Sequence, residues 1–231
     1  LSEDNIVARI HIYSLDTKKS NAVTDSFFDV GQPVFSKDGK YLFFTSERTF
    51  NPTYGWTEWN HVYTDMTNIY LVTLQASTKS PFEPKSDEVA VKEEKKEEKK
   101  DEKPAGDKKE DKALTIDFDG IVNRIAEIPT PAGSYAALST TADKIFYFRR
   151  GPKDERFNLY SYNLKDLEET SLGETMGYAI SEDQKKMLVR VGQSYGIVPL
   201  PSAPIKIKDA LDLSDMKVTL DRKAEWAQIF N

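Results

Sequence analysis

One short motif in the sequence has the residue types of a nucleophilic hydrolase. Gly192-Gln193-Ser194-Tyr195-Gly196 fits the pattern Gly-x-Ser-x-Gly, in which a sharp strand-to-helix turn exposes a serine hydroxyl. Such a site also needs an acidic residue and then a histidine later in the chain. Both histidines, His11 and His61, precede Ser194, and the motif runs into a strand-like segment ending at Pro199. We therefore interpret it as a hairpin turn between two strands.

The other candidates for chemistry are equally weak. His11 lies in a repeated segment that carries Tyr70 and Tyr160 at the same place in other copies, so packing or a hydrogen bond explains it. His61 has no second imidazole beside it, and the sequence contains no cysteine, so we expect neither a metal site nor a disulfide. No phosphate-binding glycine loop and no isolated carboxylate pair is present. We predict no catalytic residue, metal or cofactor in this chain.

Two repeated patterns organise the chain. The first, Pro33 to Ser46, is an apolar run, a turn at Asp38-Gly39 and a second apolar run, which is typical of a β-hairpin. Weaker copies, aligned without gaps, place Ser139 and Ser181 at the position of Ser36. The second pattern is a seven-residue run of β-branched and aromatic residues, which predicts an interior strand. Its copies are 9–15, 68–74, 158–164 and, more loosely, 194–200.

The two patterns alternate, which gives four strands per unit and a period of about 40–45 residues, as in propeller blades. The sequence therefore predicts an all-β fold, a partial β-propeller of about three and a half four-stranded antiparallel blades. The predicted units are the last two strands of a truncated blade (1–26), three blades (27–130, 131–175 and 176–221) and the start of a helical region (222–231).

The first complete blade contains two unusual segments. The loop 47–67 is rich in aromatic residues, including Trp56 and Trp59, and also holds His61. Its rings either fold back over a blade as packing or form a binding surface. The segment 85–112 consists largely of Lys, Asp and Glu and cannot bury enough apolar surface to fold, so we expect a solvated, disordered insertion.

Charge and hydropathy narrow the choice of partners. The formal net charge of −6 argues against a nucleic-acid partner, and no apolar stretch is long enough for a membrane span. The chain begins at Leu1 without Met or a signal peptide, so we expect a piece of a longer protein. Arg149 and Arg150, at the end of a predicted strand, join the aromatic loop as candidate contacts for a peptide or partner.

Several motifs carry a resemblance to a known family. Ser36 to Leu42 is similar to the propeller repeat shared by the TolB, prolyl-oligopeptidase and tricorn families. A more specific series of sequence motifs, taken in chain order, resembles the second propeller of tricorn-type serine proteases over nearly the whole chain. It comprises 50–54, 69–74, 80–88, 116–121 with Arg124, and Glu225-Trp226 with 228–230.

This resemblance implies a non-catalytic propeller segment of a serine peptidase whose catalytic residues lie outside this chain. The segment would act as scaffold and gate for peptide access or product exit in oligopeptide degradation. Its implied partners are peptides or unfolded polypeptide, the remaining propeller and catalytic domains, and further copies in a homo-oligomer. A periplasmic or extracytoplasmic location is implied by exported family members, with the cytoplasm as the alternative. The competing hypothesis is a stand-alone TolB-like module for protein–protein interaction.

Overall fold

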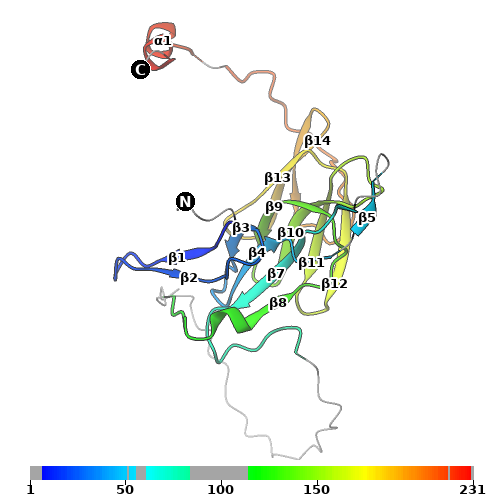
Figure 1. Cartoon of the computed structure of the whole chain (residues 1–231). Helices are drawn as coiled ribbons and strands as arrows, with labels where there is room; N and C mark the ends of the chain where they lie inside the picture. The colour runs from blue at the N-terminus through cyan, green and yellow to red at the C-terminus, as the bar shows by residue number, and fades with distance from the viewer. Residues whose placement is uncertain (1–6, 51, 56–60, 84–113, 218, 230–231) are drawn as a thin grey trace, which may run out of the picture. The chain divides into compact units, whose positions relative to one another are not determined.

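The computed structural model describes residues 7–50, 52–55, 61–83, 114–217 and 219–229 (Figure 1). The predictions for Trp56, Trp59 and the charged insertion 85–112 therefore lie outside the described residues. The chain divides into two compact units, Leu1–Ser171 and Leu172–Asn231. We describe the two units separately.

The first unit contains two antiparallel sheets of four strands and two hairpins (Figure 1). The first hairpin is β1 (His11–Tyr13) with β2 (Ser20–Ala22), and the second is β5 (Pro52–Tyr54) with β6 (His61–Tyr63). The first sheet has the order β3 (Val30–Phe35), β4 (Tyr41–Ser46), β7 (Asn68–Thr73) and β8 (Ile125–Glu127), and a short 3₁₀ helix, η1 (Ile121–Arg124), precedes β8. The second has the order β9 (Ser134–Thr140), β10 (Lys144–Arg150), β11 (Asn158–Asn163) and β12 (Glu168–Gly173), whose last residues enter the second unit.

The second unit holds a three-stranded sheet and the helix α1 (Arg222–Ile229). Its strands are β13 (Gly177–Ile180), β14 (Lys186–Val191) and β15 (Ser194–Pro199). The sequence predicted four strands here, but the described residues between Pro199 and α1 form turns and irregular chain. One backbone hydrogen bond, from Leu211 N–H to Tyr195 O at 2.8 Å, marks the side of β15 where a fourth strand would pair.

A serine closes two of the hairpin turns. The Ser36 hydroxyl donates to Asp38 at 2.7 Å and accepts from the Tyr41 N–H at 2.9 Å. Ser181 repeats this arrangement with Asp183 at 2.6 Å. The turn places Gly39 at φ +70°, whereas the equivalent Gln184 has φ +57°, a conformation that costs a non-glycine residue more.

In the hairpin between β9 and β10, the residue that closes the turn differs from the one that the gap-free alignment predicted. Thr141, not Ser139, closes this turn, because the Thr141 N–H donates to Lys144 O at 2.8 Å and its hydroxyl accepts from the Lys144 N–H at 3.1 Å. Ser139 lies inside β9, opposite Phe146. The loop is two residues shorter than in the other copies, which a comparison without gaps cannot register.

Both central strands of the first sheet are buried on both faces. Side chains alternate across a strand, so neighbouring residues of β4 and β7 enter two different cores. One core joins this sheet to the β1–β2 hairpin and contains Ile10, Val23, Leu42, Phe44, Tyr70, Val72, Leu74 and Ile121. The other joins it to the second sheet and contains Phe43, Ile69, Leu71, Ile128, Tyr135, Ile145, Tyr147 and Tyr162. The sheet is thus a layer between two neighbours, as blades are in a propeller.

Arg124 fixes the chain where it returns to the first sheet. Its guanidinium donates to the carbonyl oxygens of Thr73 at 3.1 Å and Asp119 at 2.7 Å, and also to that of Asp117. Asp117 also bonds to the chain just after β7, through its N–H to Leu74 O at 2.9 Å. The outer strand of this sheet, β8, is only three residues long, because a turn held by Arg124 precedes it.

We expect Arg124→Ala to lower the free energy of unfolding by about 2–3 kcal/mol, because three carbonyl groups lose a charged donor. Urea denaturation measures this change. The matched control Lys165→Ala, which removes an exposed ion pair with Asp143, should cost about 0.5 kcal/mol or less. Equal effects of the two substitutions would contradict the role given to Arg124.

Candidate functional site

Arg149 lies inside the first unit and not on its surface. The residue is 9% exposed, and its Nη2 forms an ion pair with Glu169 Oε2 at 2.9 Å. Its guanidinium carbon also lies 4.3 Å from the centre of the Tyr160 ring. Burial opposes the charged form of Arg149, but the Glu169 carboxylate together with the neighbouring Tyr160 and Tyr135 more than offsets burial, so the pKa of Arg149 is raised. The side chain is therefore held by packing and charge, away from solvent.

Tyrosine rings surround this ion pair. The Tyr147 hydroxyl donates to Glu169 Oε1 at 2.6 Å, and its ring stacks on Tyr160 with centroids 6.2 Å apart. Tyr135 packs against Tyr147 at 5.4 Å. Burial raises the pKa of Tyr147 well above its usual value and that of Tyr135 to about 12. The phenols consequently stay protonated donors at neutral pH.

The polar layer continues into the neighbouring sheet. The Tyr135 hydroxyl donates to Thr130 Oγ1 at 3.1 Å, and Thr130 Oγ1 donates to Asn68 Oδ1 at 2.6 Å. The Asn68 amide in turn donates to Glu127 Oε1 at 2.6 Å. Strands β7 and β8 are thereby linked to β9 through side chains. We call the residues Asn68, Glu127, Thr130, Tyr135, Tyr147, Arg149, Tyr160 and Glu169 the tyrosine layer.

Arg150 differs from its neighbour in the strand. Successive side chains of a strand point to opposite faces, so Arg150 leaves the face that carries Arg149. It is exposed, and its guanidinium carbon lies 5.2 Å from the centre of the Phe157 ring. Of the two arginines singled out in the sequence, Arg150 is therefore the one that can reach a partner without breaking a buried ion pair.

The aromatic loop carries exposed rings in its described part. Strands β5 and β6 form a hairpin within it, with Tyr54 72% and Tyr63 54% exposed. Phe50 is 74% exposed and packs on Tyr63 at 5.6 Å between ring centres. His61 begins β6, but its side chain, like Trp56 and Trp59, is outside the described part of the structure. These three described rings are exposed, and both alternatives for the loop as a whole, packing and binding, stay predictions.

Two side-chain hydrogen bonds join β3 and β9, the first strands of the two four-stranded sheets, and we call this pair of contacts the clasp. The Gln32 amide on β3 donates to Tyr135 O on β9 at 2.8 Å, and the Thr140 hydroxyl on β9 donates to Phe35 O on β3 at 2.7 Å. Both strands also bulge at a residue of positive φ, Gln32 at +51° and Ala137 at +52°. Local sequence gave no signal for these contacts, because the partners are about a hundred residues apart. The start of β3 also borders a polar pocket of about 240 Å³.

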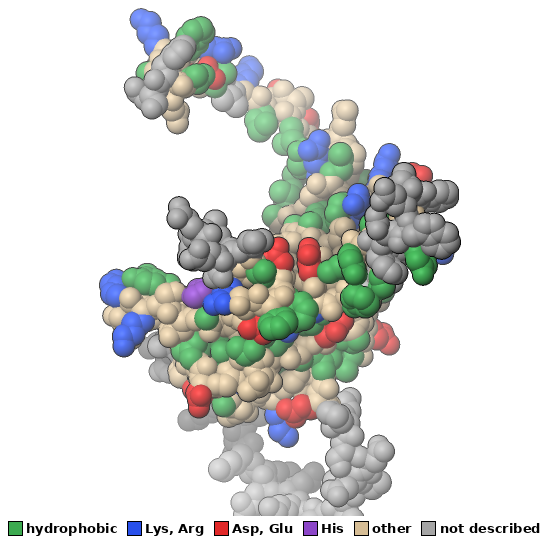
Figure 2. All heavy atoms as spheres, in the orientation of Figure 1, with side chains coloured by type: hydrophobic (Ala, Val, Ile, Leu, Met, Phe, Trp, Pro, Cys, Tyr) green, Lys and Arg blue, Asp and Glu red, His purple; other side chains and the backbone are tan. Residues whose placement is uncertain are grey.

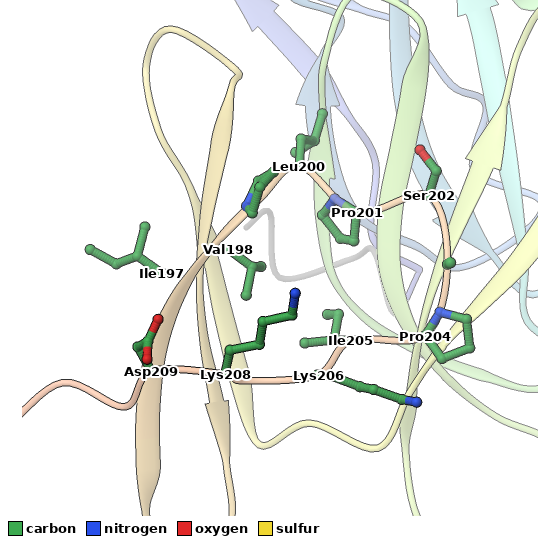
Figure 3. A pocket seen from close by; sticks show the side chains of 12 residues that line it. Ile197, Val198, Leu200, Pro201, Ser202, Pro204, Ile205, Lys206, Lys208 and Asp209 are labelled. Atoms are coloured by element: carbon green, nitrogen blue, oxygen red, sulfur yellow. The ribbon is translucent and has the colours of Figure 1, made fainter.

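The second unit contains a pocket of about 420 Å³ beside β15 (Figure 3). Ile197 to Pro199 form one side, and the loop 200–209 closes around the rest (Figure 3). Two contacts hold the loop in place. Ile205 N–H donates to Leu172 O at 2.9 Å, and Ile207 packs on Gly196 so closely that an added Cβ would lie 2.6 Å from it.

Ser194 is the first residue of β15 and follows a two-residue turn in which Gly192 has φ +59°. The interpretation of this motif as a hairpin turn is confirmed.

Within the described ranges, no group of three or more His, Cys, Asp or Glu residues could hold a metal ion, and no helix is long and apolar enough to cross a membrane. Figure 2 shows acidic and basic side chains on the same face of the molecule.

Comparison with known proteins identifies the family. The model of the tricorn protease second β-propeller domain matches residues 1–200. The chain belongs to this family. The sequence-based recognition is thereby confirmed, and so is the partial propeller, since the described strands form antiparallel sheets and the two four-stranded sheets share a core.

The similar proteins found by the comparisons are named as tricorn proteases or their homologues. Tricorn protease homolog 1 of Streptomyces coelicolor is 28% identical over 243 residues, covering 94% of this chain and 21% of that protein. A putative tricorn-like protease C-terminal subunit of Sulfurisphaera tokodaii is 26% identical over 211 residues, covering 86% and 22%. The crystal structure of the tricorn protease superposes with a TM-score of 0.63 at 18% identity, over 86% of this chain and 19% of that one. The chain thus spans about a fifth of these relatives.

The two adjacent arginines provide a matched test of the tyrosine layer. We expect Arg149→Ala to lower the free energy of unfolding by about 3 kcal/mol, because Glu169 is left as a largely buried charge, its side chain 20% exposed, without its partner. Arg150→Ala should cost about 0.5 kcal/mol or less. Chemical denaturation of both variants decides the matter, and a larger loss from Arg150→Ala would contradict this assignment.

Alkaline pH should destabilise the first unit through Tyr135. Its folded pKa of about 12 exceeds the ordinary value of 10.0, so its contribution is complete below pH 10 and is lost as the pH rises toward 12. The loss amounts to about 2–3 kcal/mol. Denaturation between pH 9 and pH 12 should show a shallower loss for Tyr135→Phe, whereas Tyr13→Phe, on an exposed ring, should follow the unsubstituted chain. An unchanged slope in Tyr135→Phe would count against the tyrosine layer.

Proposed function

We propose that this chain is a non-catalytic propeller segment of a tricorn-like peptidase, acting as scaffold and as gate for peptides entering or products leaving. The observation that carries the proposal is the family match over residues 1–200. The relatives are proteases by name and about five times longer, so the chemistry of peptide cleavage is assigned to domains beyond this segment. The partners of the segment are then those domains and the polypeptide in transit.

The clasp between β3 and β9 supports a passage. In a propeller the first strand of each blade borders the central axis, so its free edge would meet a passing peptide. Bulges and capped carbonyl groups protect an edge from pairing with another chain. Gln32 and Thr140 cap carbonyl oxygens of the neighbouring strand, and the bulges at Gln32 and Ala137 interrupt both edges. An extended peptide can therefore slide past without being retained as an extra strand.

The aromatic loop 47–67 is the proposed peptide contact, together with Arg150. Exposed rings supply contact area at low entropic cost, which suits weak binding of many sequences. Phe50, Tyr54 and Tyr63 present such rings in the described part of the loop. Trp56, Trp59 and His61 belong to the same loop and remain part of the proposal. Arg149 is a weaker member, because it would first have to leave Glu169.

The first experiment compares peptidase activity of this chain with that of its full-length parent on unstructured peptides. We expect activity in the parent only, and no effect of Ser194→Ala on it, because Ser194 begins strand β15 directly after a hairpin turn. Turnover by the 231-residue chain that Ser194→Ala abolishes would overturn the proposal. A parent without peptidase activity would favour the stand-alone interaction module instead.

The gate itself is tested by substrate length. In the parent, Tyr54→Ser should lower kcat/KM about two- to tenfold for peptides of a dozen residues, from the loss of about 0.5–1.5 kcal/mol of ring contact. A dipeptide reporter substrate should be cleaved as before. Tyr13→Ser removes an exposed ring from β1 and serves as the control. Equal losses for long and short substrates would contradict a gating role.

A further inference from the structure

The chain contains Asp followed by Gly at two places, Asp38-Gly39 and Asp119-Gly120. This pair is prone to rearrange, because glycine has no Cβ to hinder the approach of its nitrogen to the preceding carboxyl group. The nitrogen bonds to the carboxyl carbon of the aspartate, and its proton leaves with the carboxyl hydroxyl as one water. The product is a five-membered succinimide ring. Addition of one water at the main-chain carbonyl carbon reopens the ring as isoaspartate, in which the backbone runs through the side-chain carboxyl group.

The first pair lies in a turn that occupies both reacting groups. The Ser36 hydroxyl donates to Asp38 Oδ1 at 2.7 Å, and Lys40 Nζ lies 3.0 Å from Asp38 Oδ2. The Gly39 N–H donates to Ser36 O at 3.0 Å. Burial acts to raise the pKa of Asp38, but the hydrogen bonds from Ser36 and Lys40 and the Lys40 charge together outweigh it, so this pKa is lowered. The Asp38 carboxylate thus stays ionised and has no hydroxyl to release.

The second pair lies in a turn that leaves both reacting groups open. Asp119 and Gly120 are exposed. Within the described ranges, no hydrogen bond or ion pair involves the Asp119 carboxylate, and no hydrogen bond uses the Gly120 N–H. A Cβ added to Gly120, whose φ is +62°, would meet only Asn123 Nδ2 at 4.0 Å. The Gly120 nitrogen is therefore accessible and sterically unhindered.

We propose that Asp119-Gly120 is a site of spontaneous isoaspartate formation. The Gly120 nitrogen attacks the Asp119 carboxyl carbon, one water leaves, and hydrolysis of the succinimide converts Asp119 to isoaspartate. Asp38 stays in its normal form under the same conditions. The reaction requires neither an enzyme nor an oxidant, and it is independent of the gating role proposed above.

Arg124 is the restraint on this peptide. Its Nη1 donates to Asp119 O at 2.7 Å, and the same guanidinium donates to Asp117 O and, at 3.1 Å, to Thr73 O. The attack requires rotation about the bond between the Asp119 Cα and its carbonyl carbon, which displaces Asp119 O from Arg124. Isoaspartate also lengthens the backbone by one methylene just before η1, so Arg124 cannot hold all three carbonyl groups where they now lie. The modification therefore loosens the turn that precedes β8.

The rates at the two pairs provide an internal comparison. The 231-residue chain is incubated at neutral pH and physiological temperature, and peptide mapping by mass spectrometry separates the isoaspartyl peptides. We expect isoaspartate to accumulate at Asp119 at least about tenfold faster than at Asp38, a difference that corresponds to about 1.4 kcal/mol, the strength of a single hydrogen bond to a charged group. Equal rates, or a faster rate at Asp38, would overturn the proposal.

Two substitutions test the succinimide route at the same position. In Asp119→Asn the side-chain amide does not ionise, so ring closure releases ammonia instead of water and should be faster than in the unsubstituted chain. The mass gained on conversion measures it. Asp119→Glu is the matched control, because its longer side chain would have to close a less favourable six-membered ring. An unconverted Asp119→Asn variant, or a modified Asp119→Glu variant, would contradict this chemistry.

Arg124→Ala tests the restraint. Without the bond to Asp119 O, isoaspartate should form faster at Asp119 and at an unchanged rate at Asp38. Lys165→Ala, which removes an exposed ion pair, should change neither rate. Acceleration at both aspartates by Arg124→Ala would assign the reaction to unfolded chains and overturn the local account. Thermal unfolding checks that the variants are folded.

Hydrogen exchange tests the structural consequence. In chains that carry isoaspartate at position 119, the amides of η1 and β8 should exchange faster than in fresh protein, whereas those of β10 should not change. Unchanged exchange in β8 would show that the turn tolerates the added methylene and would overturn this consequence.

Discussion

The burial of β4 and β7 on both faces is the constraint on which the rest of the first unit depends. Phe43, Phe44, Ile69 and Leu71 are wholly excluded from solvent, on two different sides of one sheet. Burying each such side chain stabilises the fold by about 1.5–3 kcal/mol, but only if a neighbour covers it. The sheet therefore requires the β1–β2 hairpin on one side and the β9–β12 sheet on the other. A stack of mutually covering sheets is the physical basis of a propeller.

The tyrosine layer shows how the stack is kept in register. Apolar packing alone permits small shifts of one sheet against the next. Hydrogen bonds such as Tyr147 to Glu169 and Thr130 to Asn68 require the donor and acceptor atoms to stay at fixed positions. The layer is not fully satisfied, because Arg149 Nε is buried without a hydrogen-bond partner among the described atoms. Stacking of the Arg149 guanidinium near Tyr160 offsets part of that loss.

The sequence predicted the features that are encoded locally. Asp38-Gly39 indicated a hairpin because glycine readily takes the positive φ of the turn, and the repeated aromatic runs indicated interior strands because both faces needed apolar side chains. The contacts and turns that the sequence did not predict depend on residues far apart in the chain or on a change in loop length. The pairing of Gln32 with Tyr135 joins residues about a hundred positions apart, and the shortened turn at Thr141 shifted the alignment. The fourth strand expected after Pro199 is replaced by a proline-containing loop that bonds to Leu172 instead.

The proposed function builds on the same layering. In the proposed function, the capped first strands would let a polypeptide pass, and the loops between strands would carry the contacts. The account therefore rests on the two-sided burial, and native-state hydrogen exchange tests it most directly. We expect the amides of β4 and β7 to be the slowest to exchange in the chain, at the level of global unfolding, and those of the β1–β2 hairpin to exchange faster. Exchange of β4 and β7 as fast as that of the hairpin would contradict the account.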